Sequence, residues 1–306
     1  MFVSHRRTAL PDDRAWLSTR AIVHHAYRVH LVDNQGIVSE DRLMLRAYDR
    51  RGAVSRPIVT VMLEGEARLE ACGRAEWLGP GDVSVIEQKH LIRMRQGRHS
   101  ARFRSLALEW EPGTLAPLRP EGFVVHRRLI DPRALVDASC PLPGGERAVS
   151  VVEPWLRATL TRLRDAGLTF SPDADLVEPI DESTRQLAAV LDHLLSDLRG
   201  RPMAVDLFDQ LGLSLRQINR RVIDFNQRYG FNALGWRDAL NRRRLMLGAA
   251  LLTAPGAAVG EVSDAVGFSS PTAFSRAMAE AGFPAPSQVA RLVASLAADE
   301  AQGVIA

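Results

Sequence analysis

The spacing of apolar residues changes along the chain, from strand-like at first to helix-like later. Between about residues 22 and 110 the apolar runs are short, and residues 57–63 form one such run that stops at Gly65. Alternate positions in a later run share one face of a strand: Leu106, Leu108 and Trp110. Short strands at regular spacing predict a β-sandwich or barrel in this part.

Helical spacing begins at about residue 151, where apolar residues recur every three or four positions: Val152, Trp155, Leu156, Leu160 and Leu163. A second helix is predicted from residues 181–183 to Gly200, with an apolar stripe: Leu187, Leu191, Leu194, Leu195 and Leu198. Such a stripe needs a partner surface. The sequence leaves open whether it packs on its own domain or forms a dimer interface.

The strongest sequence signal is an internal repeat, in which a short helix runs through a glycine turn into a second, Arg-bearing helix. The copies lie at residues 206–214 and 261–270, 55 positions apart at the turn glycines. Glycine takes the positive φ of a sharp turn, and serine caps the next helix. The turn and cap residues are therefore predicted as Gly212, Ser214, Gly267 and Ser270.

The second helix of each copy divides into an apolar face and a polar face. Inward residues are Ile218, Val222 and Phe225 in the first copy and Phe274, Met278 and Ala281 in the second. Outward residues include Arg216, Asn219, Arg220, Thr272, Ser275 and Arg276. Arg pairs with guanine and Asn with adenine in the major groove, so these faces suit duplex DNA. A solvated face of an ordinary helical hairpin is the alternative, but it is disfavoured by the repetition.

Residues 235–252 predict a linking helix that would hold the two copies roughly 34 Å, about one DNA turn, apart. Its arginines are open to phosphate contact or to plain solvation, with solvation favoured for most: Arg237, Arg242, Arg243 and Arg244. Charge supports a DNA-binding role here, because residues 201–292 hold eleven Arg against seven Asp and Glu, whereas residues 1–200 are nearly balanced.

The repeat resembles the AraC/XylS family of bacterial regulators over about residues 202–289. The first copy resembles the family pattern at Ser214, Arg216, Ile218, Arg220 and Val222, and the linking helix does so at Arg244, Leu245, Leu251 and Leu252. The second copy is closer still, through residues 267–270, Phe274, Ser275, Arg276 and residues 286–287. The resemblance implies transcriptional control, usually activation with RNA polymerase as a partner. It also implies base contacts at Arg216, Asn219, Arg220, Pro271, Thr272 and Arg276.

The sequence departs from the family pattern at two places. Gln227 stands where the family has a glycine and Gly230 follows three residues later, so the first recognition helix or its loop is expected to be about one turn longer. Near the end of the second copy Gly282 and Phe283 reverse the usual order, and Val289 and Ala290 replace Tyr and Arg.

The first part of the chain resembles, more weakly, the cupin-like domain of the same family through residues 65–67 and 78–83. The expected fold is therefore α+β with two domains. Residues 1–170 would form a cupin-like barrel with flanking helices, which binds a small effector and dimerises. Residues 171–200 would connect the domains and contribute to dimerisation, and residues 201–306 would form the all-α DNA-binding domain. Effector-binding residues cannot be named from the sequence.

Other function classes are disfavoured on composition and motifs. A metal-dependent cupin enzyme with a DNA-binding tail would need converging ligands, but the adjacent His24 and His25 are expected on opposite strand faces, and His90 and His99 have no nearby partner. No phosphate-binding loop or nucleophile motif is present, so no cofactor and no enzyme activity are expected. A nonspecific DNA-coating protein would be more basic.

Cellular location is inferred from the cysteines, the N-terminus and the hydropathy pattern. Cys72 and Cys140 are far apart and are expected to be buried reduced thiols. Arg6 and Arg7 are followed by no apolar run, and no segment is apolar enough to span a membrane, so we expect a cytoplasmic, nucleoid-associated protein.

Overall fold

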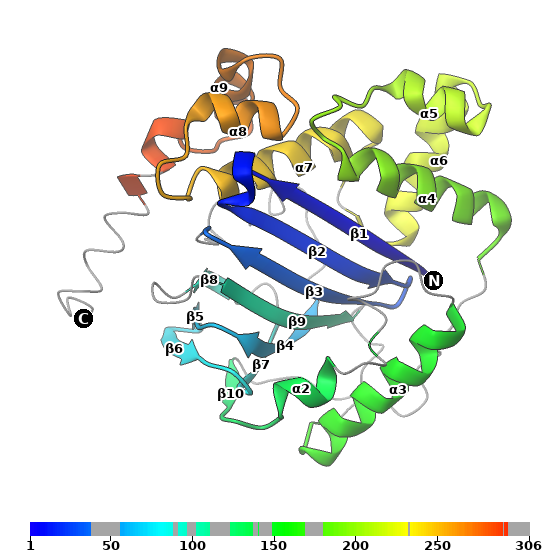
Figure 1. The fold of residues 1–306 in the computed structure, drawn as a ribbon. Coiled ribbons are helices and arrows are strands. Elements are labelled where there is room, and N and C mark those ends of the chain that lie inside the picture. The colour runs from blue at the N-terminus through cyan, green and yellow to red at the C-terminus, as the bar shows by residue number, and fades with distance from the viewer. Residues whose placement is uncertain are drawn as a thin grey trace.

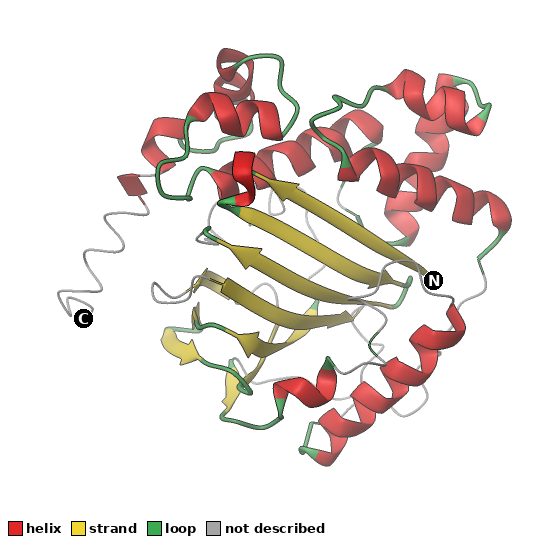
Figure 2. Ribbon diagram, in the orientation of Figure 1, coloured by secondary structure: helices red, strands yellow, loops and turns green. Residues whose placement is uncertain are grey.

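The computed structural model describes residues 1–37, 56–87, 91–96, 102–110, 123–136, 140, 149–168, 180–231, 233–289 and 291–292. Its first part is built on strands and its second on helices, so the α+β class is confirmed (Figures 1 and 2). The strands are β1 (Phe2–Ala9), β2 (Trp16–Val23), β3 (Tyr27–Gln35), β4 (Pro57–Glu64), β5 (Ala67–Ala71), β6 (Arg74–Leu78), β7 (Val83–Glu87), β8 (Leu91–Gln96), β9 (Arg102–Trp110) and β10 (Val124–His126). The helices are η1 (Pro11–Asp13), α2 (Pro132–Leu135), α3 (Val149–Asp165), α4 (Glu182–Ser196), α5 (Ala204–Leu211), α6 (Leu215–Arg228), α7 (Trp236–Leu251), α8 (Val259–Ala265) and α9 (Pro271–Glu280).

The described strands form two antiparallel sheets. A seven-stranded sheet has the order β1-β2-β3-β9-β4-β7-β10, and a three-stranded sheet has the order β6-β5-β8. The sequence placed the first strand at about residue 22, whereas the large sheet begins with β1 and with β2 at Trp16. The alternating apolar signal is absent from β1 because its inward positions include Ser4 and Arg6, which bind a carboxylate of α4.

Each face of the large sheet has its own cover. Leu106, Leu108 and Trp110 lie on one face, as predicted, and pack with α3 through Trp155 and Leu160. The opposite face, called the inward face below, carries the small sheet over Met62, Ile86 and Phe103. Near β1 and β2 the inward face is covered instead by helices of the second part (Figure 1). The two sheets therefore face each other over part of the large sheet, as in the sandwich or barrel predicted for this part, and within the described residues they are hydrogen-bonded as two separate sheets.

Helix α4 joins the sheet domain to the remaining helices. Its N-cap is Asp181, whose carboxylate accepts a hydrogen bond from the Thr184 amide at 2.9 Å. The leucine stripe is buried within the chain, in the same apolar cluster as α5 to α9 and part of β2: Leu187, Leu191, Leu194, Leu195 and Leu198. The sequence left open whether the stripe packs on its own domain or forms a dimer interface. In the structure it packs against other parts of its own chain.

Helix α7 forms the centre of the helical part and explains how the two repeats are held. At about 1.5 Å per residue its 16 residues span roughly 24 Å, with α5 and α6 near one end and α8 and α9 near the other (Figure 1). Gly248 permits close packing, since a Cβ there would lie 2.7 Å from the Phe274 ring of α9. None of the described helices is both long enough and apolar enough to cross a membrane.

Candidate nucleic-acid interface

The first repeat folds as a helix, a glycine turn and a second helix. Helix α5 ends at Gly212, which has a φ of +62°. Ser214 is the N-cap of α6, with its hydroxyl facing the Gln217 amide at 3.4 Å, while the Gln217 side chain accepts a bond from the Ser214 amide at 3.0 Å. This reciprocal capping box fixes the start of the recognition helix.

The second repeat has the same construction. The turn after α8 contains Gly267 with a φ of +77°, and a Cβ there would overlap the Leu198 carbonyl oxygen. Ser270 is the N-cap of α9 and its hydroxyl accepts a bond from the Ala273 amide at 3.1 Å. Pro271 follows as the first helical residue, where its missing N–H leaves no bond unmade.

Both recognition helices bury their apolar faces, as the pattern indicated. Ile218 and Val222 of α6 are 2% and 1% exposed, and the corresponding Phe274 and Met278 of α9 are fully buried. Phe225 is also buried, whereas Ala281 is only half-buried. The buried residues occupy equivalent positions in the two recognition helices, so the two repeats can be compared residue by residue.

The outward face of α6 is open to solvent. Arg216, Asn219 and Arg220 are all exposed and belong to the first half of the helix. The Asn219 side chain packs closely against Gly235: a Cβ at that glycine would collide with the Asn219 amide oxygen. Gly235 is also the N-cap of α7, so this contact lies where the first repeat meets the linking helix.

The outward face of α9 is smaller but equally accessible. Pro271, Thr272 and Arg276 are exposed, and Ser275 is half-buried. Arg276 lies 3.9 Å from Glu280, with about three quarters of both side chains exposed, so this ion pair contributes little and leaves the guanidinium available.

Helix α6 has 14 residues against 10 in α9, and Gly230 follows it with a φ of +60°. Its last turn and the following loop contact the sheet domain. The Phe2 ring of β1 lies 5.4 Å from the Phe225 ring, and the Arg28 guanidinium donates a bond to the Tyr229 carbonyl and stacks 4.4 Å from the Phe231 ring. The last turn of α6 and the following loop therefore anchor the first repeat to the sheet.

Other bonds join the sheet domain to α4 and to the second repeat. Asp192 of α4 accepts bonds from the Ser4 hydroxyl at 2.6 Å, the His5 amide at 3.0 Å and the Arg6 guanidinium at 2.9 Å. Arg14, next to η1, pairs with Glu261 of α8. None of these residues belongs to α6 or α9.

The arginines of α7 differ in their surroundings. Arg237 is exposed, and Arg242 forms an ion pair with Asp238 at 3.1 Å. Arg244 is half-buried beneath the second turn, 5.7 Å from the Phe268 ring, and burial together with Arg201 lowers its pKa. The sequence favoured plain solvation for most of these arginines. Arg244 differs, because it packs inside the second repeat.

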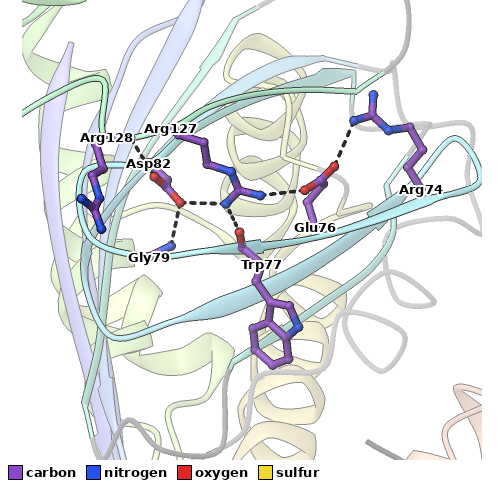
Figure 3. Close-up of polar contacts among 7 residues, drawn as sticks. All are labelled: Arg74, Glu76, Trp77, Gly79, Asp82, Arg127 and Arg128. Carbon is purple, nitrogen blue, oxygen red and sulfur yellow. Dashed lines mark hydrogen bonds and ion pairs between the residues drawn. The ribbon is translucent and has the colours of Figure 1, made fainter. Parts of the chain in front are cut away.

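The cupin-like turn at residues 78–83 is organised by one carboxylate (Figure 3). Asp82 accepts bonds from the Gly79 amide at 3.0 Å, the Arg128 amide at 2.8 Å and the Arg127 guanidinium at 2.9 Å. Burial opposes ionisation, but these hydrogen bonds outweigh it and hold the pKa of Asp82 below its ordinary value. Arg127 also pairs with Glu76 at 2.7 Å, so the cluster ties β6, β7 and β10 together.

Two sequence expectations about the sheet domain are corrected. His24 and His25 lie in the turn after β2 rather than within a strand, so they do not point to opposite strand faces, and their ring centroids are 4.2 Å apart. His24 is buried and stacks on Tyr27 at 4.5 Å. Cys72 is exposed in the tight turn between β5 and β6 instead of buried, whereas Cys140 is buried as expected, and neither cysteine forms a disulfide among the described residues.

Within the described ranges, no group of three or more His, Cys, Asp or Glu is placed to hold a metal ion. His90 and His99 lie outside the described residues.

Comparisons with known proteins give similarities to solved structures only. No protein-family model matches the sequence, and no curated protein matches it. Similar structures include the AraC-like transcriptional activator CuxR, which is 16% identical, with 80% of this chain and 86% of that chain covered and a TM-score of 0.37. ToxT from Vibrio cholerae O395 is 10% identical, with 88% and 99% covered and a TM-score of 0.33.

A ToxT structure with a bound unsaturated fatty acid is also similar, at 12% identity, with 87% of this chain and 95% of that chain covered and a TM-score of 0.29. The description of CuxR as AraC-like names the same family that the sequence motifs of this chain resemble.

Proposed function

We propose that the chain is a sequence-specific DNA-binding transcription regulator that reads one duplex with α6 and α9. The observation that supports this most directly is the pair of capped recognition helices, whose apolar faces are buried while Arg216, Arg220 and Arg276 stay exposed. Arginine can form two hydrogen bonds to guanine, and the N-terminal half of a recognition helix enters the major groove. Asn219, Pro271, Thr272 and Ser275 complete the proposed contact surface.

Control by a small effector is the second element of the proposal, and it rests on the inward face of the large sheet. His30, Thr60 and Ser84 share this face across paired strands, and Asn34 lies on the same face four residues after His30 along β3. Among the described residues the amide of Asn34 and the hydroxyl of Ser84 are buried without hydrogen-bond partners. Desolvation lowers the pKa of His30 despite the opposing charge of Glu109, so a neutral imidazole is available to an effector beside these polar groups.

The contacts between sheet and helices offer a route from effector to DNA. An effector alters DNA binding only if it favours one arrangement of the domains over another. Phe2 and Arg28 contact the end of α6, and Arg14 contacts α8, so movement of β1 to β3 would act on both repeats. Homodimerisation, activation through RNA polymerase, a nucleoid location and the division at residues 170 and 200 remain parts of this proposal.

Selection of DNA by the full-length chain tests the proposal. A duplex is enriched from a randomised pool, and binding is compared for the wild type and for the Arg220→Ala and Arg276→Ala variants. Each variant should lose about 1 to 3 kcal/mol of specific binding, because each removes one base-reading guanidinium. Arg291→Ala is a control, since Arg291 is exposed beyond α9. Failure to enrich any sequence would reject the proposal.

The alternative is a metal-dependent enzyme fused to a DNA-binding domain. It predicts stoichiometric iron or zinc in protein purified without chelator, with ligands that would have to include residues outside the described set. Metal analysis of the full-length protein separates the two hypotheses.

A further inference from the structure

The first residue of α6 carries an apolar side chain that folding leaves exposed. Leu215 is 57% exposed, whereas Ile218 and Val222 on the next turns of the same helix are almost completely buried. The capping box around Ser214 fixes the backbone on either side of this position. Leu215 therefore projects from a well-defined helix start and adds little to the core.

The internal repeat gives this position a counterpart. Ser214 and Ser270 cap the two recognition helices, so Leu215 is equivalent to Pro271, and both residues are apolar and exposed. In helix-turn-helix proteins the N-terminal residues of the recognition helix reach the base edges. If Pro271 lies at the DNA surface, the symmetry of the repeat places Leu215 there too.

The neighbours of Leu215 indicate what it would contact. Arg216 follows it directly, and Asn219 lies four residues later, so the Leu215 and Asn219 side chains are adjacent on the helix surface. Arg and Asn suit guanine and adenine, but neither recognises the one apolar mark in the major groove, the C5 methyl group of thymine. An exposed leucine supplies the complementary apolar surface.

We propose that Leu215 is a specificity-determining residue that contacts a thymine methyl group in the DNA read by α6. This inference rests on the proposed DNA-binding function and adds to it a base preference that the arginines do not explain. Packing one methyl-sized group against Leu215 corresponds to about a fourfold change in affinity.

Uracil substitution tests the contact, because deoxyuridine differs from thymidine only by lacking the methyl group. The full-length chain first selects its preferred duplex, and each thymine is then replaced singly by uracil. Wild-type affinity should fall about fourfold at one position. Leu215→Ala should bind the thymine duplex about fourfold more weakly than the wild type and should lose nothing further on uracil substitution at that position.

Leu234→Ala is the matched control, because Leu234 is 64% exposed but lies before α7, off both recognition helices. This variant should keep the wild-type preference for thymine. Equal melting temperatures of the three proteins establish that folding is unchanged. A wild type insensitive to uracil at every position, or a Leu215→Ala variant that still discriminates like the wild type, would overturn the inference. Absence of selected DNA would instead overturn the proposed function.

Discussion

The Phe2 ring stands edge-on to the Tyr229 ring, with centroids 5.2 Å apart and an interplanar angle of 84°. This contact joins the first strand of the sheet to the residue that caps the end of α6. Aromatic pairs of this geometry contribute about 0.5 to 1.5 kcal/mol beyond the area they bury. The contact therefore links the sheet domain to the helix proposed to read DNA.

Replacement of Phe2 by alanine should weaken this link. We expect Phe2→Ala to lower the free energy of unfolding by about 1 to 3 kcal/mol, since Phe2 contacts both Phe225 and Tyr229. Chemical denaturation measures the loss. Phe208→Ala is the control because Phe208 is 46% exposed on α5, and its replacement should cost under about 1 kcal/mol. Equal effects of the two substitutions would contradict the interpretation.

The two turn glycines should differ in their tolerance of alanine. Both Gly212 and Gly267 have positive φ, which costs alanine about 1 to 2 kcal/mol. At Gly212 a Cβ meets nothing within 4 Å, whereas at Gly267 it collides with the Leu198 carbonyl. Gly267→Ala should therefore destabilise by more than about 3 kcal/mol and Gly212→Ala by about 1 to 2 kcal/mol. Melting curves that rank the two the other way would refute the described packing of the second turn on residue 198.

The hydrogen bonds to Asp82 predict a dependence of stability on pH. Because the pKa of Asp82 is lower in the folded than in the unfolded protein, its contribution is complete above the unfolded value of about 4 and is lost as the pH falls through the folded value. Asp82→Asn should cost about 1 to 3 kcal/mol at pH 7. The cost should begin to shrink below about pH 4, where the carboxyl of the unfolded protein takes up a proton, and should be smallest below the lowered pKa of the folded protein, where the folded wild-type carboxyl is neutral too.

Urea denaturation between pH 2.5 and 7 measures this effect. Glu76→Gln serves as a comparison because Glu76 pairs with Arg127 and Arg74 at a more exposed position. An Asp82→Asn cost that stays constant over the whole pH range would show that the carboxylate charge is not what holds the turn.

The buried amide of Asn34 predicts a gain in stability on replacement. Its polar atoms lack partners among the described residues, and its cross-strand neighbours are Leu17 and Phe103, which are apolar. Asn34→Val should raise the free energy of unfolding of the ligand-free protein by about 1 to 3 kcal/mol, because it removes an unsatisfied polar group. The same variant should lose any response to an effector. A less stable variant would indicate that the amide is bonded in solution.

The helical part of the chain is predictable from sequence because its signals are local. Gly212, Ser214, Gly267 and Ser270 lie within a few residues of the turns and caps that they form, and a 3.6-residue period marks the buried faces. The end of α6 is also marked locally, because the helix ends at Arg228 and Gly230 follows with a positive φ.

The contacts between the domains are not predictable in this way. Phe2 and Tyr229 are more than 200 residues apart, and no periodic pattern connects them. Strand β1 escaped detection because its inward positions bind Asp192 rather than an apolar core. Asp82 is recognisable as a turn residue, but its partners Arg127 and Arg128 follow only from the pairing of β10 with β7. The spacing of the leucines in α4 likewise predicts which face of the helix is buried, but it does not predict the surface on which that face packs.

A hydroxyl-radical footprint of the full-length chain on its selected duplex tests the central claim most directly. Two recognition helices held by one linking helix should protect two segments on the same side of the duplex, about one helical turn or 10 base pairs apart. Arg220→Ala should weaken one protected segment and Arg276→Ala the other. A single protected segment unaffected by either substitution would contradict the claim that α6 and α9 read the DNA together.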